Sequence, residues 1–329
     1  MIEVPQLGLD GAPELVFQPA VDLATGRLLG FEALLRWNDP ELGPIPPSVL
    51  IPWAEANGHM VELNAWVLSA ACEAAAQWQA DLQLAVNCSV FQLRQREAAS
   101  AAAAALERSG LNPDRLTIEI TETSVVDGAA AADLHAMSRL GIQLTVDDIG
   151  SDWSTIESMG QFAINTMKID GTLISGLTDP AGVSRAMVET IVHVSHSLGI
   201  CTVAESVETG RQVRVLRELG ADVGQGYFFA PPLNVEDAHM LTTMEPVPVF
   251  PLTGDDDDDD VDDTSGPTYG ATDIAAEVMG ALDAADSARA PDDDAGALVG
   301  DDLHFEANDL ALVSKKGRLM GSFRRGRGS

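Results

Sequence analysis

Carboxylates, amides and one lysine recur at the carboxyl ends of short apolar runs in the first 244 residues. These residues are Glu32, Asn87, Glu119 with Glu122, Asp147 with Asp148, Lys168, Glu205 with Glu208, and Gln225. Any one of them alone is typical of a solvated or paired surface position. Their recurrence in successive runs instead predicts one shared site, because the carboxyl ends of barrel strands converge on one mouth.

The residue types indicate metal-assisted chemistry on a phosphate ester. Carboxylates gathered at one site repel one another unless cations compensate their charge. The donors are all oxygen atoms, which favours Mg²⁺ or Mn²⁺ over Zn²⁺ or copper. Four or five carboxylates exceed what one such ion usually takes from a protein, so we expect two ions, an arrangement that suits phosphodiester hydrolysis.

Lys168 is the only lysine in the first 244 residues. A surface lysine is one interpretation. The other is a buried ammonium among the carboxylates, which would orient water or neutralise phosphate. The His193 and His196 pair on an expected helix is more typical of packed or solvated residues than of a metal site, and Cys88 and Ser89 have no partners at the spacing of a nucleophilic triad.

Eight β-rich runs are expected to position these residues. They cover residues 15–21, 28–36, 82–88, 116–121, 142–147, 166–169, 202–204 and 226–229. Helical stretches are expected between most of them, at residues 48–56, 62–80, 90–109, 129–140, 182–198 and 210–219.

The spacing of these runs predicts the fold. The first two runs are joined by a connection too short for a crossover helix, so they should pair antiparallel. The later runs alternate with helices, as parallel strands do. We therefore predict an α/β fold, a modified TIM-type (β/α)8 barrel with an antiparallel first strand. A doubly wound open sheet is the alternative, although no Gly-rich phosphate loop follows the first run.

Composition divides the chain near residue 246. Residues 1–246 are expected to form the barrel and residues 247–329 a disordered acidic tail, because residues 255–260 are six consecutive aspartates and like charges at that density cannot bury a core. The tail ends in a basic segment, and the alternative is that it binds a partner, not identified by the sequence, or the barrel itself.

The overall charge and the cysteines limit the class of protein. The net charge of −32 argues against a DNA-binding protein, which needs a basic surface for the phosphate backbone. Cys72, Cys88 and Cys201 form no CxxC pair, which favours a reducing compartment. We find no signal peptide and no apolar run long enough to span a membrane, so the sequence predicts a cytoplasmic protein.

An ordered set of motifs over about residues 15–233 resembles the EAL family of bacterial cyclic-di-GMP phosphodiesterases. The set comprises Gln18-Pro19, Glu32-Ala33-Leu34-Leu35-Arg36, Val86-Asn87, Glu119-Ile120-Thr121-Glu122, Asp147-Asp148, Lys168-Ile169-Asp170, Ala204-Glu205-Ser206-Val207-Glu208 and Gln225-Gly226-Tyr227. The resemblance implies that two Mg²⁺ or Mn²⁺ ions activate water to open cyclic-di-GMP to linear pGpG.

The resemblance also implies roles for individual residues. The matched metal ligands are Glu32, Asn87, Glu119, Asp147, Asp148 and Glu205. Lys168 matches the lysine that contacts the attacking water. Glu205 matches a residue that has also been assigned as a general base. The resemblance therefore implies that the catalytic residues are Lys168, Glu205 and Glu32. The positions that match a substrate-facing residue are Gln18, Leu34, Arg36 and Gln225. Glu122 matches the residue that holds the loop after the fifth strand, and Glu208 a supporting acid.

Two departures from the family pattern bear on this interpretation. The loop after Asp148 reads Ile149-Gly150-Ser151-Asp152 where the family usually has Phe-Gly-Thr-Gly, and Ser206 replaces a glycine. In the family this loop couples metal binding to dimer contacts, so a homodimer through it is a hypothesis. Because no predicted ligand is lost, we expect an active phosphodiesterase; the alternative is a non-catalytic cyclic-di-GMP receptor that signals through its tail.

Overall fold

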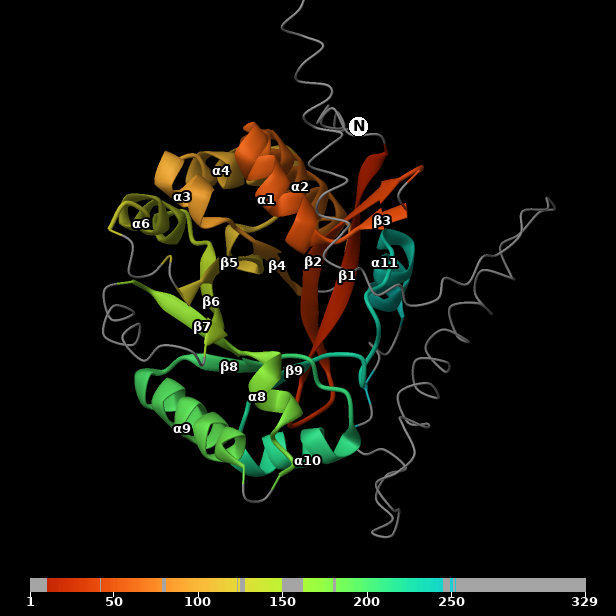
Figure 1. The fold of residues 1–329 in the computed structure, drawn as a ribbon, viewed down its shortest axis with the longest axis vertical. Helices are drawn as coiled ribbons and strands as arrows, with labels where there is room; N and C mark the ends of the chain where they lie inside the picture. The colour runs from red at the N-terminus through yellow and green to blue at the C-terminus, as the bar shows by residue number, and fades with distance from the viewer. Residues whose placement is uncertain are drawn as a thin grey trace, which may run out of the picture.

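The computed structural model describes residues 11–41, 43–78, 81–122, 124, 128–149, 162–179, 182–244, 249–250 and 252. Within these residues, eight strands form a closed ring (Figure 1). In chain order they are β1 (Ala12–Asp22), β2 (Leu28–Asp39), β4 (Gln83–Asn87), β5 (Leu116–Thr121), β6 (Gln143–Ile149), β7 (Ile164–Ile169), β8 (Cys201–Ala204) and β9 (Val223–Gln225).

The ring closes through its first strand. β1 pairs antiparallel with β2 on one side and with β9 on the other. The remaining neighbours, from β2 through β4 to β9, pair parallel. A short strand, β3 (Gly43–Ile45), extends β2 outside the ring. The predicted TIM-type barrel with an antiparallel first strand is confirmed, and the open-sheet alternative is wrong because β1 joins both ends of the sheet.

Helices surround the outer face of the barrel (Figure 1). They are α1 (Pro47–Asn57), α2 (Met60–Ala75), α3 (Val90–Gln95), α4 (Ala98–Ser109), a 3₁₀ turn η1 (Pro113–Arg115), α6 (Ala131–Arg139), α8 (Gly171–Ser175), α9 (Val183–Leu198), α10 (Gly210–Leu219) and α11 (Val235–Thr243). None of the helices in the described part of the chain is long and apolar enough to cross a membrane.

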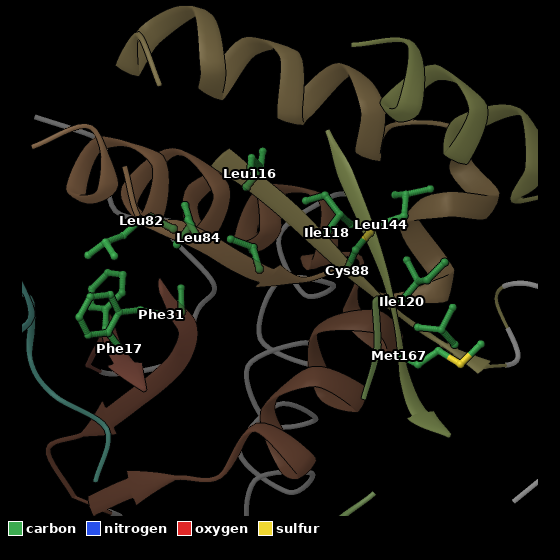
Figure 2. Packing of buried hydrophobic residues seen from close by; sticks show 14 of the residues in the cluster. Phe17, Phe31, Leu82, Leu84, Cys88, Leu116, Ile118, Ile120, Leu144 and Met167 are labelled. Atoms are coloured by element: carbon green, nitrogen blue, oxygen red, sulfur yellow. The ribbon is translucent and has the colours of Figure 1, made fainter. Parts of the chain in front are cut away.

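The alternation of side chains on β5 shows how the sheet divides core from site. Leu116, Ile118 and Ile120 are all buried and point outward into the layer between sheet and helices (Figure 2). The residues between them, Thr117 and Glu119, line the interior of the barrel. Successive strand residues face opposite sides, so one short run supplies both an apolar outer layer and a polar interior.

Local signals fix the ends of α10, the helix that follows the seventh strand of the ring. Thr209 accepts a hydrogen bond from Gln212 N, and the Gln212 side chain accepts from Thr209 N, which forms a capping box. The helix ends at Gly220, whose φ of 79° places it in the left-handed region that glycine adopts at little cost.

The structure differs from the expected elements in several places. The last ring strand covers Val223–Gln225, and residues 227–229 form a turn instead of the expected strand, because Gly226 turns the chain with a φ of 153°. The helix expected over residues 90–109 is divided at Arg96, which has a φ of 59°. The helix expected to reach residue 80 ends at Ala75, and the short α8 and α11 were not anticipated.

Two residues beyond the expected end of the barrel pack against it. Val249 forms a β-bridge with Arg27, and Phe250 N donates a hydrogen bond of 2.7 Å to Gly26 O. The Phe250 ring is buried and lies edge-on to Phe229, with ring centroids 6.4 Å apart. Residues 249 and 250 therefore pack against the barrel. The boundary at residue 246 and the disorder of the tail stay predictions, since most of residues 247–329 lie outside the described part.

Candidate active site

The polar residues expected at one mouth are brought together there. Glu32, Glu119, Asp147 and Lys168 lie on β2, β5, β6 and β7, Asn87 and Gln225 are the last residues of β4 and β9, and Glu205 follows β8 directly. Along the strands these residues alternate with outward-facing apolar ones, so their side chains enter the barrel. The convergence of seven separate strands produces a cluster that no single segment could form.

Lys168 is the centre of this cluster and is only 2 % exposed. Its Nζ lies 2.5 Å from Glu205 Oε1, 3.1 Å from Glu119 Oε2, 3.2 Å from Glu32 Oε2 and 3.7 Å from Asp147 Oδ1. The surface-lysine alternative is therefore wrong. We call Lys168 and these four carboxylates the acid–lysine cluster.

Amide side chains fix the orientation of one member, Glu32. Asn87 Nδ2 donates to Glu32 Oε1 at 2.6 Å, and Gln225 Nε2 donates to Glu32 Oε2 at 2.8 Å. Gln225 Nε2 also lies 3.2 Å from Gln18 Oε1 on β1. Hydrogen bonds to an ionised carboxylate are stronger than neutral ones, so these amides hold Glu32 charged and in one orientation.

The cluster perturbs the acidities of its members. Burial, and then the charge of Glu32, raises the pKa of Glu119 well above its usual range. Burial also raises the pKa of Glu205 to about 7. For Glu32, burial acts to raise the pKa, but Lys168 and the amide hydrogen bonds outweigh it and the pKa is lowered.

The Lys168 ammonium stays charged for the corresponding reason. Burial acts to lower its pKa, but the surrounding carboxylates outweigh this and raise the pKa well above its usual range. One ammonium cannot neutralise four carboxylates, and burial makes the uncompensated charge costly. The cluster therefore favours additional cations.

The residues fit a hard divalent cation by their chemistry. Every donor in the cluster is a carboxylate or amide oxygen, the ligand type of Mg²⁺ and Mn²⁺. In the described part of the chain, no group of three or more His, Cys, Asp or Glu side chains has the arrangement of a metal site. Glu32, Asn87, Glu119, Asp147 and Glu205 are the residues that would hold an ion.

A pocket of about 470 Å³ lies at the mouth beside the cluster. Its lining contains three of the four predicted substrate-facing residues, namely Gln18, Leu34 and Gln225. The fourth, Arg36, is half-buried, is not part of this lining, and donates from Nη1 to Leu35 O at 3.0 Å. The pocket has room for part of a dinucleotide, with the acid–lysine cluster at its side.

The remaining predicted residues are placed less centrally. Glu122 directly follows β5 and is buried. Glu208 is exposed and lines the mouth pocket, with its backbone N–H bound to Gln212. Asp148 belongs to β6, but its side chain, like residues 150–152 and the dimer hypothesis that depends on them, lies outside what the structure describes.

Two pocket residues received no role from the sequence. Tyr227 lines the mouth pocket with 60 % of its surface exposed, and its neighbour Gly226 signals the sharp turn that presents it. Ser206 lines the same pocket with a φ of 51°, a conformation that costs a residue with a Cβ about 1 kcal/mol or more. The sequence could have pointed to Ser206, because the EAL-family motif has glycine at this position.

The fold and the site together define a TIM-type barrel with an acidic, lysine-centred mouth, and comparison with known proteins agrees. The family model described as "EAL domain" matches residues 9–232. The oxygen sensor protein DosP of Escherichia coli is 34 % identical over 230 residues, which cover 68 % of this chain and 29 % of DosP. The bifunctional diguanylate cyclase/cyclic di-GMP phosphodiesterase MucR of Pseudomonas aeruginosa is 33 % identical over 228 residues, which cover 68 % of this chain and 33 % of MucR.

A solved structure is similar as well. The PaMucR phosphodiesterase in complex with c-di-GMP matches 68 % of this chain and 93 % of its own, with a TM-score of 0.65 and 33 % identity. The chain belongs to the EAL-domain family, which confirms the resemblance seen in its motifs. It spans about a third or less of the length of the two curated relatives named above, so those proteins carry regions with no counterpart in the matched segment.

Proposed function

We propose that this protein hydrolyses one phosphodiester bond of cyclic-di-GMP to give linear pGpG, with two Mg²⁺ or Mn²⁺ ions bound by the mouth carboxylates. The observation that carries the proposal is the acid–lysine cluster, four carboxylates around one buried lysine at the carboxyl ends of the strands. The complex of the related PaMucR phosphodiesterase with c-di-GMP supports the choice of substrate. We place the reaction in the bacterial cytoplasm.

The reaction requires an oxygen nucleophile at phosphorus and a proton for the leaving group. The water oxygen bonds to phosphorus while the bond from phosphorus to the ribose O3′ breaks. One of the two water protons ends on O3′, and the other is released from the new terminal phosphate at neutral pH. Bound divalent ions supply charge stabilisation and lower the pKa of water. The proposed ligands are Glu32, Asn87, Glu119, Asp147, Asp148 and Glu205.

Lys168 has the position to act on the nucleophile. Its ammonium is held by Glu205, Glu119 and Glu32 at 2.5–3.2 Å, so its position is fixed before substrate arrives. We propose that it donates a hydrogen bond to the attacking water and offsets charge on the phosphate. Glu205 is the candidate proton acceptor; a divalent ion held by these residues would lower the pKa of water and so reduce the demand on this base.

The mouth pocket is the proposed substrate site. Gln18, Leu34 and Gln225 line it and present two amides and one apolar surface, a combination that suits a nucleobase and ribose. Because Gln225 also holds Glu32, substrate that contacts this amide reaches directly to the metal-binding side of the cluster. Arg36 is proposed to meet a phosphate oxygen from the neighbouring part of β2.

The test is to incubate the purified full chain with cyclic-di-GMP and Mg²⁺ or Mn²⁺ and to measure pGpG by chromatography. We expect product with either ion and none with EDTA. Glu119→Gln should lower the rate at least a hundredfold, equivalent to about 2.7 kcal/mol, whereas Glu189→Gln on the exposed face of α9 should not. Binding of cyclic-di-GMP without turnover would instead support the receptor alternative.

A further inference from the structure

A layer of small side chains lies directly beneath the acid–lysine cluster. Inward-facing residues recur every two positions along a strand. On the parallel strands the layer therefore consists of the residues two positions before those at the mouth. On antiparallel β1 the corresponding residue lies two positions after Gln18. Its members include Ala20, Gly30, Ala85, Thr117, Thr145 and Thr166, and two valines complete it. No side chain in this layer is larger than valine.

The small layer leaves the barrel hollow. The interior of a TIM barrel is normally filled by bulky branched side chains in stacked layers, but here it holds a cavity of about 180 Å³. The cavity extends from Lys168 and Glu119 down to Leu29 and Gln83. These two residues lie at the amino ends of β2 and β4 and are exposed, so the cavity reaches the face opposite the mouth.

The wall of the cavity is partly polar. Thr117, Thr145 and Thr166 lie on three adjacent strands, with Thr145 paired directly to Thr166. Within the described residues none of the three hydroxyls has a hydrogen-bond partner, and Thr145 is only 2 % exposed. Thr117 and Thr166 are half-buried. Hydroxyls that line a cavity and have no protein partner are normally satisfied by water. One water takes about 30 Å³ of liquid volume, so the cavity can hold several.

We propose that the barrel interior holds a column of ordered water that joins the underside of the acid–lysine cluster to solvent at the amino-terminal face. The three threonine hydroxyls anchor it, and Glu119 and Lys168 meet its upper end. When substrate covers the mouth, the column is the route by which a proton released in the reaction leaves the cluster. The column itself is independent of the proposed function, whereas its kinetic role rests on it.

The first test counts the water molecules. A crystal structure of the full chain at high resolution should show at least three ordered waters between Lys168 and Gln83, bound to the threonine hydroxyls. The double variant Thr145→Val with Thr166→Val, which keeps side-chain shape but removes two hydroxyls, should lose waters from this region. An interior without ordered water in the wild type would overturn the proposal whether or not the protein hydrolyses cyclic-di-GMP.

The second test measures the kinetic role in the same variants. The double valine variant should lower kcat about fivefold to tenfold with KM within about twofold, and should enlarge the solvent deuterium isotope effect on kcat. Thr166→Ser, which keeps a hydroxyl, should restore most of the lost rate relative to Thr166→Val. Thr242→Val removes a buried hydroxyl on α11 outside the cavity and should leave kcat and the isotope effect unchanged. A double variant that loses waters but keeps both quantities would refute the proton route.

Discussion

Replacing Lys168 with methionine tests the central claim about the site. Methionine keeps much of the length and apolar stem of lysine but removes the ammonium. Four carboxylate oxygens that lie 2.5–3.7 Å from Nζ then lose the positive partner that they share. Because Lys168 is 2 % exposed, bulk solvent screens the remaining carboxylate charge poorly. The variant should therefore be destabilised when no divalent ion is present.

The size of the effect follows from burial. Removing one partner of a buried ion pair typically costs about 3–5 kcal/mol, and protonation of the carboxylates limits the cost to this range. For a domain of this size, 1 kcal/mol shifts Tm by about 2–4 °C, so we expect a fall of about 10 °C. Arg185→Met removes an exposed partner of Glu218, at 3.1 Å, and should cost less than about 1 kcal/mol.

The assay is thermal and urea unfolding in EDTA and again in saturating Mn²⁺. In EDTA the loss in Lys168→Met should exceed that in Arg185→Met several-fold. In Mn²⁺ the difference should shrink, because bound cations supply the missing positive charge. Hydrolysis should still fall at least a hundredfold, about 2.7 kcal/mol, because the fixed ammonium is absent.

The pH dependence of the stability of Lys168→Met tests the same claim more sharply than its stability at one pH. Lys168 acts to lower the pKa values of Glu32, Glu119 and Glu205, so in the folded variant all three should lie higher than in the wild type. A carboxyl group with a higher pKa in the folded state binds more protons when folded, so stability falls as pH rises. In EDTA the gap between variant and wild type should therefore widen from about pH 5 to pH 8. A loss below 1 kcal/mol, or a gap that narrows with pH, would refute the buried counter-charge.

Two further predictions concern positions outside the cluster. A chain that ends at residue 246 lacks the buried Phe250 and should melt about 4–8 °C below a chain that ends at residue 252, because burial of this ring contributes about 2 kcal/mol; equal Tm values would show that the ring adds nothing. Gly226→Ala should lower Tm far more than Gly220→Ala, because its Cβ would lie 2.3 Å from the backbone of Val207, whereas Gly220 has no atom within 4 Å of the added carbon. Equal losses would mean that only the backbone conformation matters.

The sequence predicted the ring and its polar mouth because strand periodicity is local. On β5 the order Leu116, Thr117, Ile118, Glu119 shows both faces of the strand before any contact is known. The same logic placed Glu32 and Lys168 at one mouth, since parallel strands joined by helices must align their carboxyl ends. These residues share a period of two along each strand, and this period does not depend on the tilt of the strands in the barrel.

The sequence could not predict features that depend on distant segments. The aromatic run after Gly226 has the composition of a strand, but the close approach of Val207 to that glycine turns it into the rim of the mouth pocket. Phe250 lies in a segment that looks like a linker, and its partners Gly26 and Phe229 are more than 200 and about 20 residues away in the chain. Such contacts follow from the closed barrel and not from local propensity.

The arrangement of the barrel explains how one fold can carry so much buried charge and an interior cavity. A polar mouth and a layer of small residues beneath it contribute little apolar burial, so the interior cannot be the main source of stability. The outer layer supplies it instead: Leu84, Ile118, Leu144 and Met167 are each no more than 1 % exposed where the sheet packs against its helices. Each fully buried side chain of this kind contributes about 1.5–3 kcal/mol. Stability and chemistry thus occupy opposite faces of the same strands, which leaves the inner face free to change without loss of the fold.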